Sequence, residues 1–268
     1  MAARASAIIN VMAAAARKAA RKLVRDFGEV EQLQVSVKGP GEFVSSADLA
    51  AEQTLRRELE KARPGYSFLM EEGGSVVGKD IANRFIIDPL DGTTNFLHGL
   101  PHFAVSIALE REGKLIATTV YDPVKDEMFW AEKGLGAYVN DRRMRVSARR
   151  NLADAVIATG IPFRGHGDHA KYVKTLAAVM NATSGVRRWG VASLDLAYVA
   201  AGRFDGFWEY GLKPWDIAGG VLLVREAGGY VSQLDGSPSM LDSGEILAAN
   251  DHLHVELGRL LKAAEASA

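Results

Sequence analysis

The chain has 268 residues, of which 48% are hydrophobic, and this apolar content is enough for one large domain or two small ones. The 32 Lys and Arg residues nearly balance the 33 Asp and Glu residues, so a net charge of −1 argues against general binding to nucleic acid or to acidic membranes. The absence of cysteine excludes disulfides, thiolate nucleophiles and thiolate zinc sites.

The N-terminus is predicted to form a surface helix. Apolar residues recur about one turn apart from Ile8 to Phe27, as on the buried face of an amphipathic helix. The apolar stretch 7–16 resembles a secretory signal only superficially, because five basic residues follow between positions 17 and 25. An Arg-rich, acid-poor start leaves a transit peptide as the alternative. No apolar run approaches the roughly 18 residues of a membrane helix, so we expect a cytoplasmic protein without a membrane partner.

The rest of the first half is rich in predicted strands. Alternation from Leu33 to Val37 predicts a half-buried strand, and residues 42–46 can return as its partner after a Gly-Pro turn. Asp48 then opens a helical pattern that stops at Pro64. Further strands are predicted at 68–70, 85–87, 103–110, 115–121, 127–131 and 137–139.

The second half shows alternating helices and strands. An antiparallel-rich half, 1–145, followed by an alternating half, 146–268, indicates an α/β protein of layered α+β type. We expect the two halves to share one continuous core and to form a single domain, 1–268. Strands are predicted at 155–158, 205–209, 230–234 and 246–249, and helices at 168–182, 192–201, 216–227 and 251–264.

The strongest chemical signal is the sequence FIIDPLDGTTN at 85–95. A buried strand ends on Asp88, and the turn that follows can aim Asp88, Asp91 and the Leu90 carbonyl at one place. Such hard oxygen donors suit Mg²⁺, and the N–H groups of a helix beginning at Thr93 would suit phosphate. An ordinary turn could explain the Asp-Gly pair alone, but two carboxylates at a buried strand end need a cation or a proton between them.

Three other acidic positions gain weight from this motif. The Glu pair that starts at Glu71 follows another short apolar strand, so it would lie near Asp88 if the two strands are neighbours. A solvated strand end is the alternative. Asp48 and Asp216 stand at predicted helix starts, where capping is the alternative. The glycine pair at 219–220 indicates that a packed strand or a metal site approaches that helix closely.

Two other clusters are given no catalytic role. The basic and aromatic residues at 187–190 are too few for a nucleic-acid surface, so a solvated edge is expected there. His166 and His169 are three residues apart in a Gly-rich loop without a third ligand, so a zinc site is not expected.

Taken in order, these motifs resemble the inositol monophosphatase family of Mg²⁺-dependent, lithium-sensitive sugar phosphatases, and within it the bacterial inositol-1-monophosphatase branch. The resemblance runs from about Lys38 to about Asn250. Four elements in the family's order make it far more specific than any one of them alone. The elements are VSSAD at 44–48, the Glu pair at 71–72, DPLDGTTNF at 88–96 and WDIAGG at 215–220.

The resemblance implies a sugar-phosphatase fold with alternating αβαβα layers, two or three Mg²⁺ ions, and a homodimer. It implies that a metal-activated water attacks the phosphate, with Asp48 and Thr93 orienting the water and Glu71 helping to draw off its proton. Asp88 would be shared between two ions. The implied metal ligands are Glu71, Asp88, the Leu90 carbonyl, Asp91 and Asp216.

The resemblance also implies the substrate, a phosphorylated polyol, with myo-inositol 1-phosphate expected first. Val191 stands where relatives often carry a hydroxyl residue, so fructose 1,6-bisphosphate, histidinol phosphate and a phosphoadenosine nucleotide are alternative substrates. An interaction protein of the transcription or RNA machinery is the alternative of another class. The implied substrate contacts are Asp91, Gly92, Thr93, Gly190, Val191, Ala192, Glu209 and Asp216.

Overall fold

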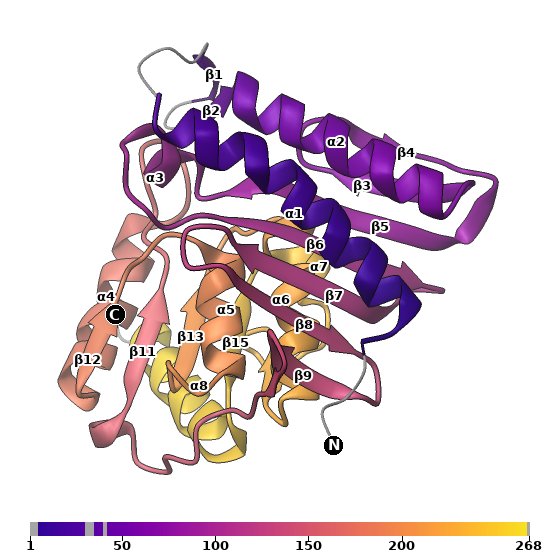
Figure 1. Ribbon diagram of the computed structural model, residues 1–268. Coiled ribbons are helices and arrows are strands. Elements are labelled where there is room, and N and C mark those ends of the chain that lie inside the picture. The colour runs from indigo at the N-terminus through magenta and orange to yellow at the C-terminus, as the bar shows by residue number, and fades with distance from the viewer. Residues whose placement is uncertain (1–4, 30–34, 40–41, 267–268) are drawn as a thin grey trace.

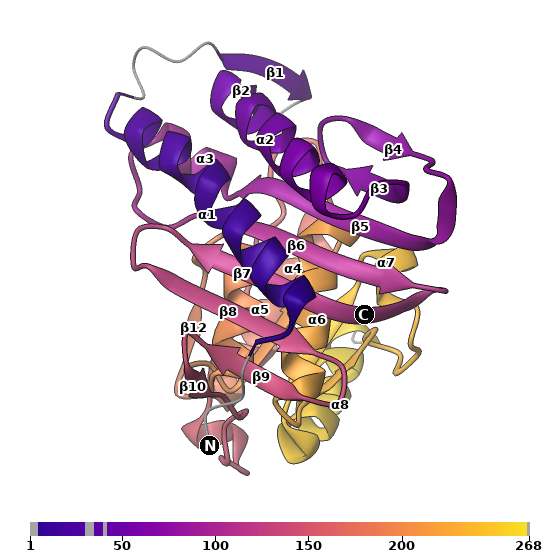
Figure 2. The same ribbon diagram turned by 45° about the vertical axis from the view of Figure 1, so that its right-hand side comes forward.

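The computed structural model describes residues 5–29, 35–39 and 42–266 and arranges them in alternating layers of helix and sheet (Figure 1). The longer helices are α1 (Ala7–Phe27), α2 (Ser46–Ala62), α4 (His169–Ala182), α5 (Ala192–Ala200), α6 (Pro214–Glu226) and α8 (Asp251–Ala266). Figure 2 shows α1 and α2 side by side over the outer face of a large sheet. α5 and α6 lie between this sheet and a smaller one, and α4 and α8 cover the far side, which confirms the αβαβα order.

The larger sheet places the two apolar runs that lead into carboxylates next to each other. Its described strands follow the order β10-β9-β8-β7-β6-β5-β3-β4. Their bounds are β3 (Tyr66–Met70), β4 (Gly74–Val76), β5 (Asp80–Asp91), β6 (Ala104–Arg111), β7 (Lys114–Asp122), β8 (Glu127–Glu132), β9 (Gly136–Val139) and β10 (Arg142–Arg143). β5 is parallel to β3, with Met70 opposite Ile87, and antiparallel to β6. The expected neighbouring strands are therefore confirmed.

The smaller sheet belongs to the second half of the chain and mixes parallel and antiparallel pairs. The described strands follow the order β12-β11-β13-β15-β14. They are β11 (Val156–Thr159), β12 (Gly185–Arg187), β13 (Gly206–Glu209), β14 (Tyr230–Ser232) and β15 (Ile246–Ala249). Three short strands, β4, β10 and β12, were not predicted, nor were the short helices η2 (Leu152–Asp154) and α7 (Met240–Ser243), whereas α3 (Thr93–Leu97) begins at Thr93, where a helix start was expected.

The N-terminal helix α1 confirms the predicted amphipathic pattern. Ser6 caps it by accepting a hydrogen bond from the backbone of Ile9, and the buried face includes Met12 and Leu23. Ile9 is fully buried and Ile8 only partly so, which shifts the apolar face slightly from the one expected. No helix within the described ranges, α1 included, is long and apolar enough to cross a membrane.

The apolar core forms several clusters on either side of the sheets, and the central cluster contains residues of both halves of the chain. One cluster, including Leu55 and Phe85, fills the space between the larger sheet and the outer helices. A second, including Phe129 and Leu196, lies around α5 and α6 between the sheets. A third, including Leu257, lies under α4 and α8. Each helix layer thus packs in its own cluster, the central one touching both sheets, and the single-domain organisation remains a prediction.

Asp48 and Asp216 both lie three positions further into their helices than the N-cap position that the capping interpretation expected. Ser45 is the N-cap of α2, and Asp48, the third helical residue, accepts the Ser45 backbone N–H at 2.8 Å. Asp216 is the third residue of α6 and accepts the backbone N–H of Lys213 at 2.7 Å. Each carboxylate therefore caps its helix by reaching back, because the third position brings its side chain over the unpaired N–H before the helix.

Close packing explains the glycine pair in α6. A Cβ atom on Gly219 would lie 2.8 Å from the Ser106 hydroxyl oxygen of β6, and one on Gly220 would lie 2.4 Å from Cβ of Leu196 in α5. Side chains at these positions would push α6 away from both neighbours. Of the two explanations that the sequence left open, the packed neighbour is confirmed, and these glycines bring the start of α6 close to the larger sheet.

The hairpin of β1 (Val35–Gly39) and β2 (Glu42–Ser45) forms as predicted, but its burial does not. Val35 and Val37 are 45% and 69% exposed. The half-buried strand was a wrong prediction because, in the described part of the chain, β1 and β2 pair only with each other. Leu33 and the tip at 40–41 lie outside the described residues.

Candidate active site

Four carboxylates from three separate elements approach one end of the larger sheet. Asp88 and Asp91 lie at the end of β5. Glu71 follows the parallel neighbour β3, and its backbone N–H donates to the Ile87 carbonyl at 3.2 Å, directly before Asp88. Asp216 comes from the first turn of α6, which packs against β5 and β6. We call Glu71, Asp88, Asp91 and Asp216 the four-carboxylate set.

The members of the four-carboxylate set repel one another electrostatically. Asp88 is only 2% exposed, and burial is the largest cause that raises its pKa well above the ordinary value. The negative charges of the other three members raise the pKa of Asp88 further. Burial also raises the pKa of Asp216, followed by the charge of Asp91. All four side chains are therefore within range of one another's charge, which is the meeting of distant acidic residues that the sequence predicted.

The backbone at the end of β5 separates Asp88 from Asp91. The pairing of β5 with β6 is irregular between these two residues, where the proline interrupts the ladder. Asp88 Oδ1 accepts the Leu90 N–H at 3.0 Å, so the chain folds back on the first carboxylate. Asp91 Oδ2 accepts the Ser193 N–H at 2.7 Å from the start of α5. Burial raises the pKa of Asp91 to about 6, although this hydrogen bond favours its charged form.

Thr93 lies against Asp48, as the predicted pair of water-orienting residues requires. Its hydroxyl oxygen is 3.0 Å from Asp48 Oδ1 and 3.0 Å from the Leu90 carbonyl oxygen, and both are acceptors. Asp48 is buried, and its other oxygen accepts from the backbone and hydroxyl of Ser45. A threonine that donates to a fixed carboxylate keeps its lone pairs free to accept a hydrogen bond from a water molecule.

Gly92 forms the sharp corner between β5 and α3. Its φ of 95° is in the left-handed region that favours glycine, and an added Cβ would lie 2.8 Å from Cγ2 of Val191. The first N–H groups of α3, from Thr93 onward, have no acceptor within their own helix. They lie next to the end of β5, where a phosphate bound to the four-carboxylate set through a cation would need donors.

The predicted alcohol-binding residues come from the second half of the chain. Val191 is the N-cap of α5, and the side chains of Val191 and Ala192 are buried, so only their backbone could reach a substrate. Glu209 ends β13 and faces Gly160, where an added Cβ would lie within 1.8 Å of the carboxylate. Burial and the charge of Asp91 raise the pKa of Glu209 to about 8, and Arg188 opposes this rise.

Sequence reasoning missed one acidic group near this side of the site. Asp195 is buried in α5, and neither of its carboxylate oxygens has a hydrogen-bond partner among the described residues. Burial raises its pKa well above the ordinary value, and the charges of Glu209 and Asp91 add to this. An Asp within the otherwise apolar run 194–200 was the available signal, because such a residue is seldom buried without a reason.

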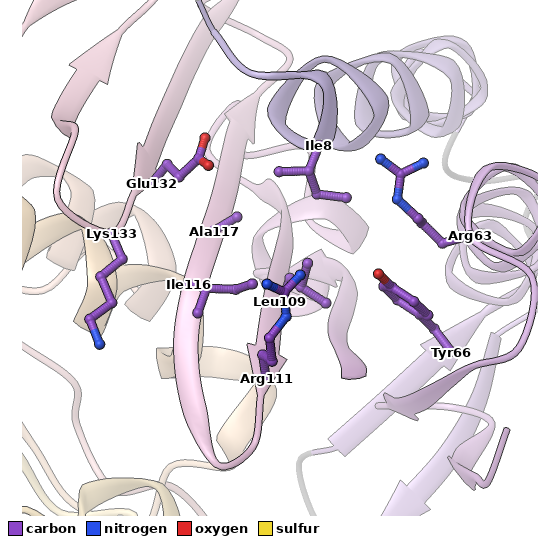
Figure 3. Close-up of a pocket in the computed structure, with 9 residues that line it drawn as sticks. All are labelled: Ile8, Arg63, Tyr66, Leu109, Arg111, Ile116, Ala117, Glu132 and Lys133. Carbon is purple, nitrogen blue, oxygen red and sulfur yellow. The ribbon is translucent and has the colours of Figure 1, made fainter. Parts of the chain in front are cut away.

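Two open cavities of the surface lie away from the four-carboxylate set. A cavity of about 330 Å³ lies between the start of α1 and the far ends of β6 and β7, where Ile8, Tyr66 and Arg111 line it (Figure 3). Another, of about 630 Å³, lies beside β4. None of the four carboxylates lines either cavity. Cavity size is therefore a poor guide to function here, and the buried charge is a better one.

A model of the inositol monophosphatase family matches residues 5–267. The chain belongs to this family. A relative from Mesorhizobium japonicum named inositol-1-monophosphatase is 58% identical over 257 residues, with 96% of this chain and 97% of that protein covered. A relative from Pseudomonas aeruginosa named Nus factor SuhB is 46% identical, with 91% of each protein covered. The crystal structure of extragenic suppressor protein suhB from Bartonella henselae matches with a TM-score of 0.94 and 57% identity, covering 96% of this chain and 99% of that chain.

The donor chemistry of the site fits the metal dependence of this family. Carboxylate and carbonyl oxygens are the ligands that hard divalent cations prefer. Among the described residues, no group of three or more acidic or imidazole side chains is arranged so that it could hold a metal ion, so the four-carboxylate set is not in a metal-binding geometry here. Burial and the neighbouring negative charges together raise the pKa values of Asp88 and Asp216, and a cation between these groups would relieve the part that is due to repulsion.

Without divalent cations, the protein is expected to lose stability as the pH rises through the pKa of Glu209, about 8. A carboxyl with a raised pKa holds its proton more tightly in the folded state, so its contribution is complete at low pH and is lost as the pH rises through the folded value. We expect the free energy of unfolding, measured by urea denaturation in a chelator, to fall between about pH 4.5 and about pH 8 and to level off above pH 8, because only in this interval does the folded state hold a proton that the unfolded state has lost.

Glu209→Gln provides the matched comparison, because it keeps the shape of the side chain and cannot ionise. The difference in unfolding free energy between the variant and the wild type should grow in favour of the variant across the same pH interval. Equal pH dependence of the two proteins would contradict a raised pKa at Glu209.

Proposed function

We propose that this protein is a Mg²⁺-dependent phosphomonoesterase that hydrolyses myo-inositol 1-phosphate to inositol and phosphate. One observation carries the proposal: the fold gathers four carboxylates, with Asp88 buried and the other three partly buried, beside a threonine that a fifth carboxylate, Asp48, holds in place. Burying unpaired negative charge is costly, so such an arrangement is expected where a cation belongs. A phosphate monoester would bring more negative charge to the same place, and its reaction depends on cations and oriented donors.

The proposed ligand assignment follows the order of the residues along the site. Glu71, Asp88 and the Leu90 carbonyl would hold one cation, and Asp91 and Asp216 would hold a second one that Asp88 shares. A third, weaker ion would lie near Glu71. When bound, Mg²⁺ supplies positive charge to the phosphoryl oxygens and lowers the pKa of water, so that a nucleophile is available near neutral pH.

The residues of the chain then position and deprotonate the attacking water. Asp48 fixes the Thr93 hydroxyl at 3.0 Å, and the threonine oxygen accepts a hydrogen bond from the water. Glu71 helps to remove the proton of the water as the new bond to phosphorus forms and the bond to the alcohol oxygen breaks. The N–H groups of Gly92 and Thr93 donate to the phosphate oxygens. Water supplies the new oxygen, and no covalent bond to the enzyme forms.

The alcohol is proposed to bind where the second half of the chain meets this site. Glu209, Asp91 and the backbone of 190–192 would bind the hydroxyl groups of the polyol. Inositol phosphate is favoured by the names of several relatives that are 54–58% identical to this chain. Because Val191 directs its side chain toward Gly92, the segment can offer a polyol only backbone groups at that position. Fructose 1,6-bisphosphate, histidinol phosphate and phosphoadenosine nucleotides remain the competing substrates.

Asp91→Asn is expected to lower turnover by about 100-fold or more, because it removes one negative ligand from the site. The amide oxygen can still accept the Ser193 N–H, so the fold should be retained. Phosphate release with Mg²⁺ measures the effect, and circular dichroism checks the fold. Asp141→Asn, in the exposed turn before β10, is the matched control and should leave turnover unchanged. Wild-type turnover in the Asp91 variant would contradict the proposed metal site.

A panel of phosphate monoesters tests the substrate. We expect the highest kcat/KM on myo-inositol 1-phosphate, no release without Mg²⁺, and a lower rate when Li⁺ is added. The panel contains myo-inositol 1-phosphate, fructose 1,6-bisphosphate, histidinol phosphate and 3′-phosphoadenosine 5′-phosphate. A higher kcat/KM on one of the other three would keep the chemistry and replace the substrate.

A second role, as a partner of the transcription or RNA machinery, is a further candidate because the Pseudomonas relative carries the name Nus factor SuhB. This role could coexist with catalysis, and the charge balance of the chain does not require it. A tagged full-length protein should recover polymerase or RNA components from a lysate of its own cells if the role exists, and Asp91→Asn should recover them equally. Recovery of none would remove the second role.

The remaining expectations, a homodimer and a cytoplasmic location, are part of the same proposal. Size-exclusion chromatography with light scattering would determine the first. The homodimer follows from the family resemblance and the location from the sequence pattern, and neither affects the chemistry of the site.

A further inference from the structure

Asn95 joins two parts of the site that are far apart in sequence. It lies in α3, two residues after Thr93, and its side chain is only 6% exposed. Its amide nitrogen donates to the His102 carbonyl at 3.0 Å and to the Trp189 carbonyl at 2.9 Å. A primary amide has two N–H groups, so both are used on backbone acceptors.

Two other contacts join the same segments. We call residues 91–95 the phosphate turn and residues 189–193 the alcohol segment. The Ser193 N–H donates to Asp91 at 2.7 Å, and Val191 packs against Gly92 so closely that no Cβ would fit there. The phosphate turn and the alcohol segment are thus linked at three successive places. Among these links, the Asn95 bond is made by a side chain that is not proposed to touch metal or substrate.

The bond to Trp189 orients a backbone group of the alcohol segment. The Trp189 carbonyl and the Gly190 N–H belong to one peptide unit, and in a trans peptide these two groups point in opposite directions. Fixing the carbonyl toward Asn95 therefore fixes the Gly190 N–H away from it. Gly190 itself has a φ of 74°, a conformation that gives the segment a sharp bend.

The aromatic surroundings show that the segment is supported on one side only. The Trp189 ring meets the rings of His102, Tyr198 and Phe204 edge-on at centroid distances of 5.0, 5.6 and 5.3 Å. Trp189 nevertheless remains 40% exposed. These ring contacts hold the side chain, but they do not determine the rotation of the peptide unit that follows it.

We propose that Asn95 is a positioning residue that sets the backbone of the alcohol segment relative to the phosphate turn, and through it the selectivity for a polyol over other alcohols. The inference rests on the proposed function, in which the backbone of 190–192 binds the polyol. Asn95 does not take part in the chemical step. Its loss should therefore lower kcat/KM most for substrates whose hydroxyl groups bind the alcohol segment.

The test compares two phosphate monoesters in Asn95→Ala and Asn95→Asp. The first substitution removes both donors, and the second keeps the size but places acceptor oxygens against two carbonyls. p-Nitrophenyl phosphate has no hydroxyl groups for the alcohol segment, whereas myo-inositol 1-phosphate has five. We expect kcat/KM for the inositol ester to fall about tenfold, mainly through KM, since the displaced alcohol segment would lose one or two hydrogen bonds to the polyol. For the aryl ester it should stay within about twofold of wild type.

His98→Ala, at the C-cap of the same short helix, is the matched control. Its exposed ring lies 2.8 Å from the Thr94 carbonyl and has no other hydrogen bond to the described part of the chain, so neither substrate should be affected. Equal losses on both substrates in the Asn95 variants would show a merely structural role and overturn the inference. Unchanged kinetics on both would also overturn it.

A spectroscopic measurement tests the positioning role of Asn95 without depending on enzyme activity. In protein labelled with 5-fluorotryptophan, the ¹⁹F resonance of Trp189, assigned with Trp189→Phe, should shift in Asn95→Ala while those of Trp130 and Trp208 stay in place. An unmoved Trp189 resonance would overturn the positioning role. If wild type hydrolyses neither ester, the proposed function and the selectivity claim fail together, and a shifted resonance would still support the positioning role.

Discussion

The structure depends on keeping four like charges close together in a place that is partly shielded from water. Repulsion among Glu71, Asp88, Asp91 and Asp216 opposes folding, and this repulsion adds to burial in raising the pKa values of Asp88 and Asp216. The surrounding sheet and helices must therefore hold the side chains by packing and backbone hydrogen bonds. A protein gains nothing in stability from such an arrangement, so its persistence indicates a function that needs the charge.

The fold meets this demand with rigid elements from three layers. β3 and β5 are parallel neighbours, which brings Glu71 beside Asp88 without any contribution from the side chains. The interruption between Asp88 and Asp91 then separates the last two carboxylates of β5. α6 can bring Asp216 close because Gly219 leaves room for β6. The position of each charge is thus set by backbone packing and is stable to changes in the alcohol-binding residues.

Local sequence patterns predicted the elements and the acidic residues well, because both depend on short-range chemistry. The apolar runs before Glu71 and Asp88 revealed their strands, and the turn after Asp88 revealed the oxygen donors. The hairpin at Val35 formed as predicted, but its burial was mispredicted because alternation cannot tell whether a strand has a sheet to pack on. The bond from Asn95 to Trp189 was equally inaccessible, since nothing local connects residues 94 positions apart.

The division of the site between the two halves of the chain has a consequence for its evolution and use. The first half and one helix of the second supply the charge that acts on the phosphate, whereas β13 and the start of α5 supply the proposed alcohol contacts. Because the two sets meet through a few links, such as Ser193 to Asp91, the alcohol side can change with little effect on the carboxylates. Val191 illustrates this, since its side chain packs on Gly92 and leaves every carboxylate in place. Substrate preference is therefore expected to vary more readily than the reaction itself, and the links between the halves limit how far it can vary.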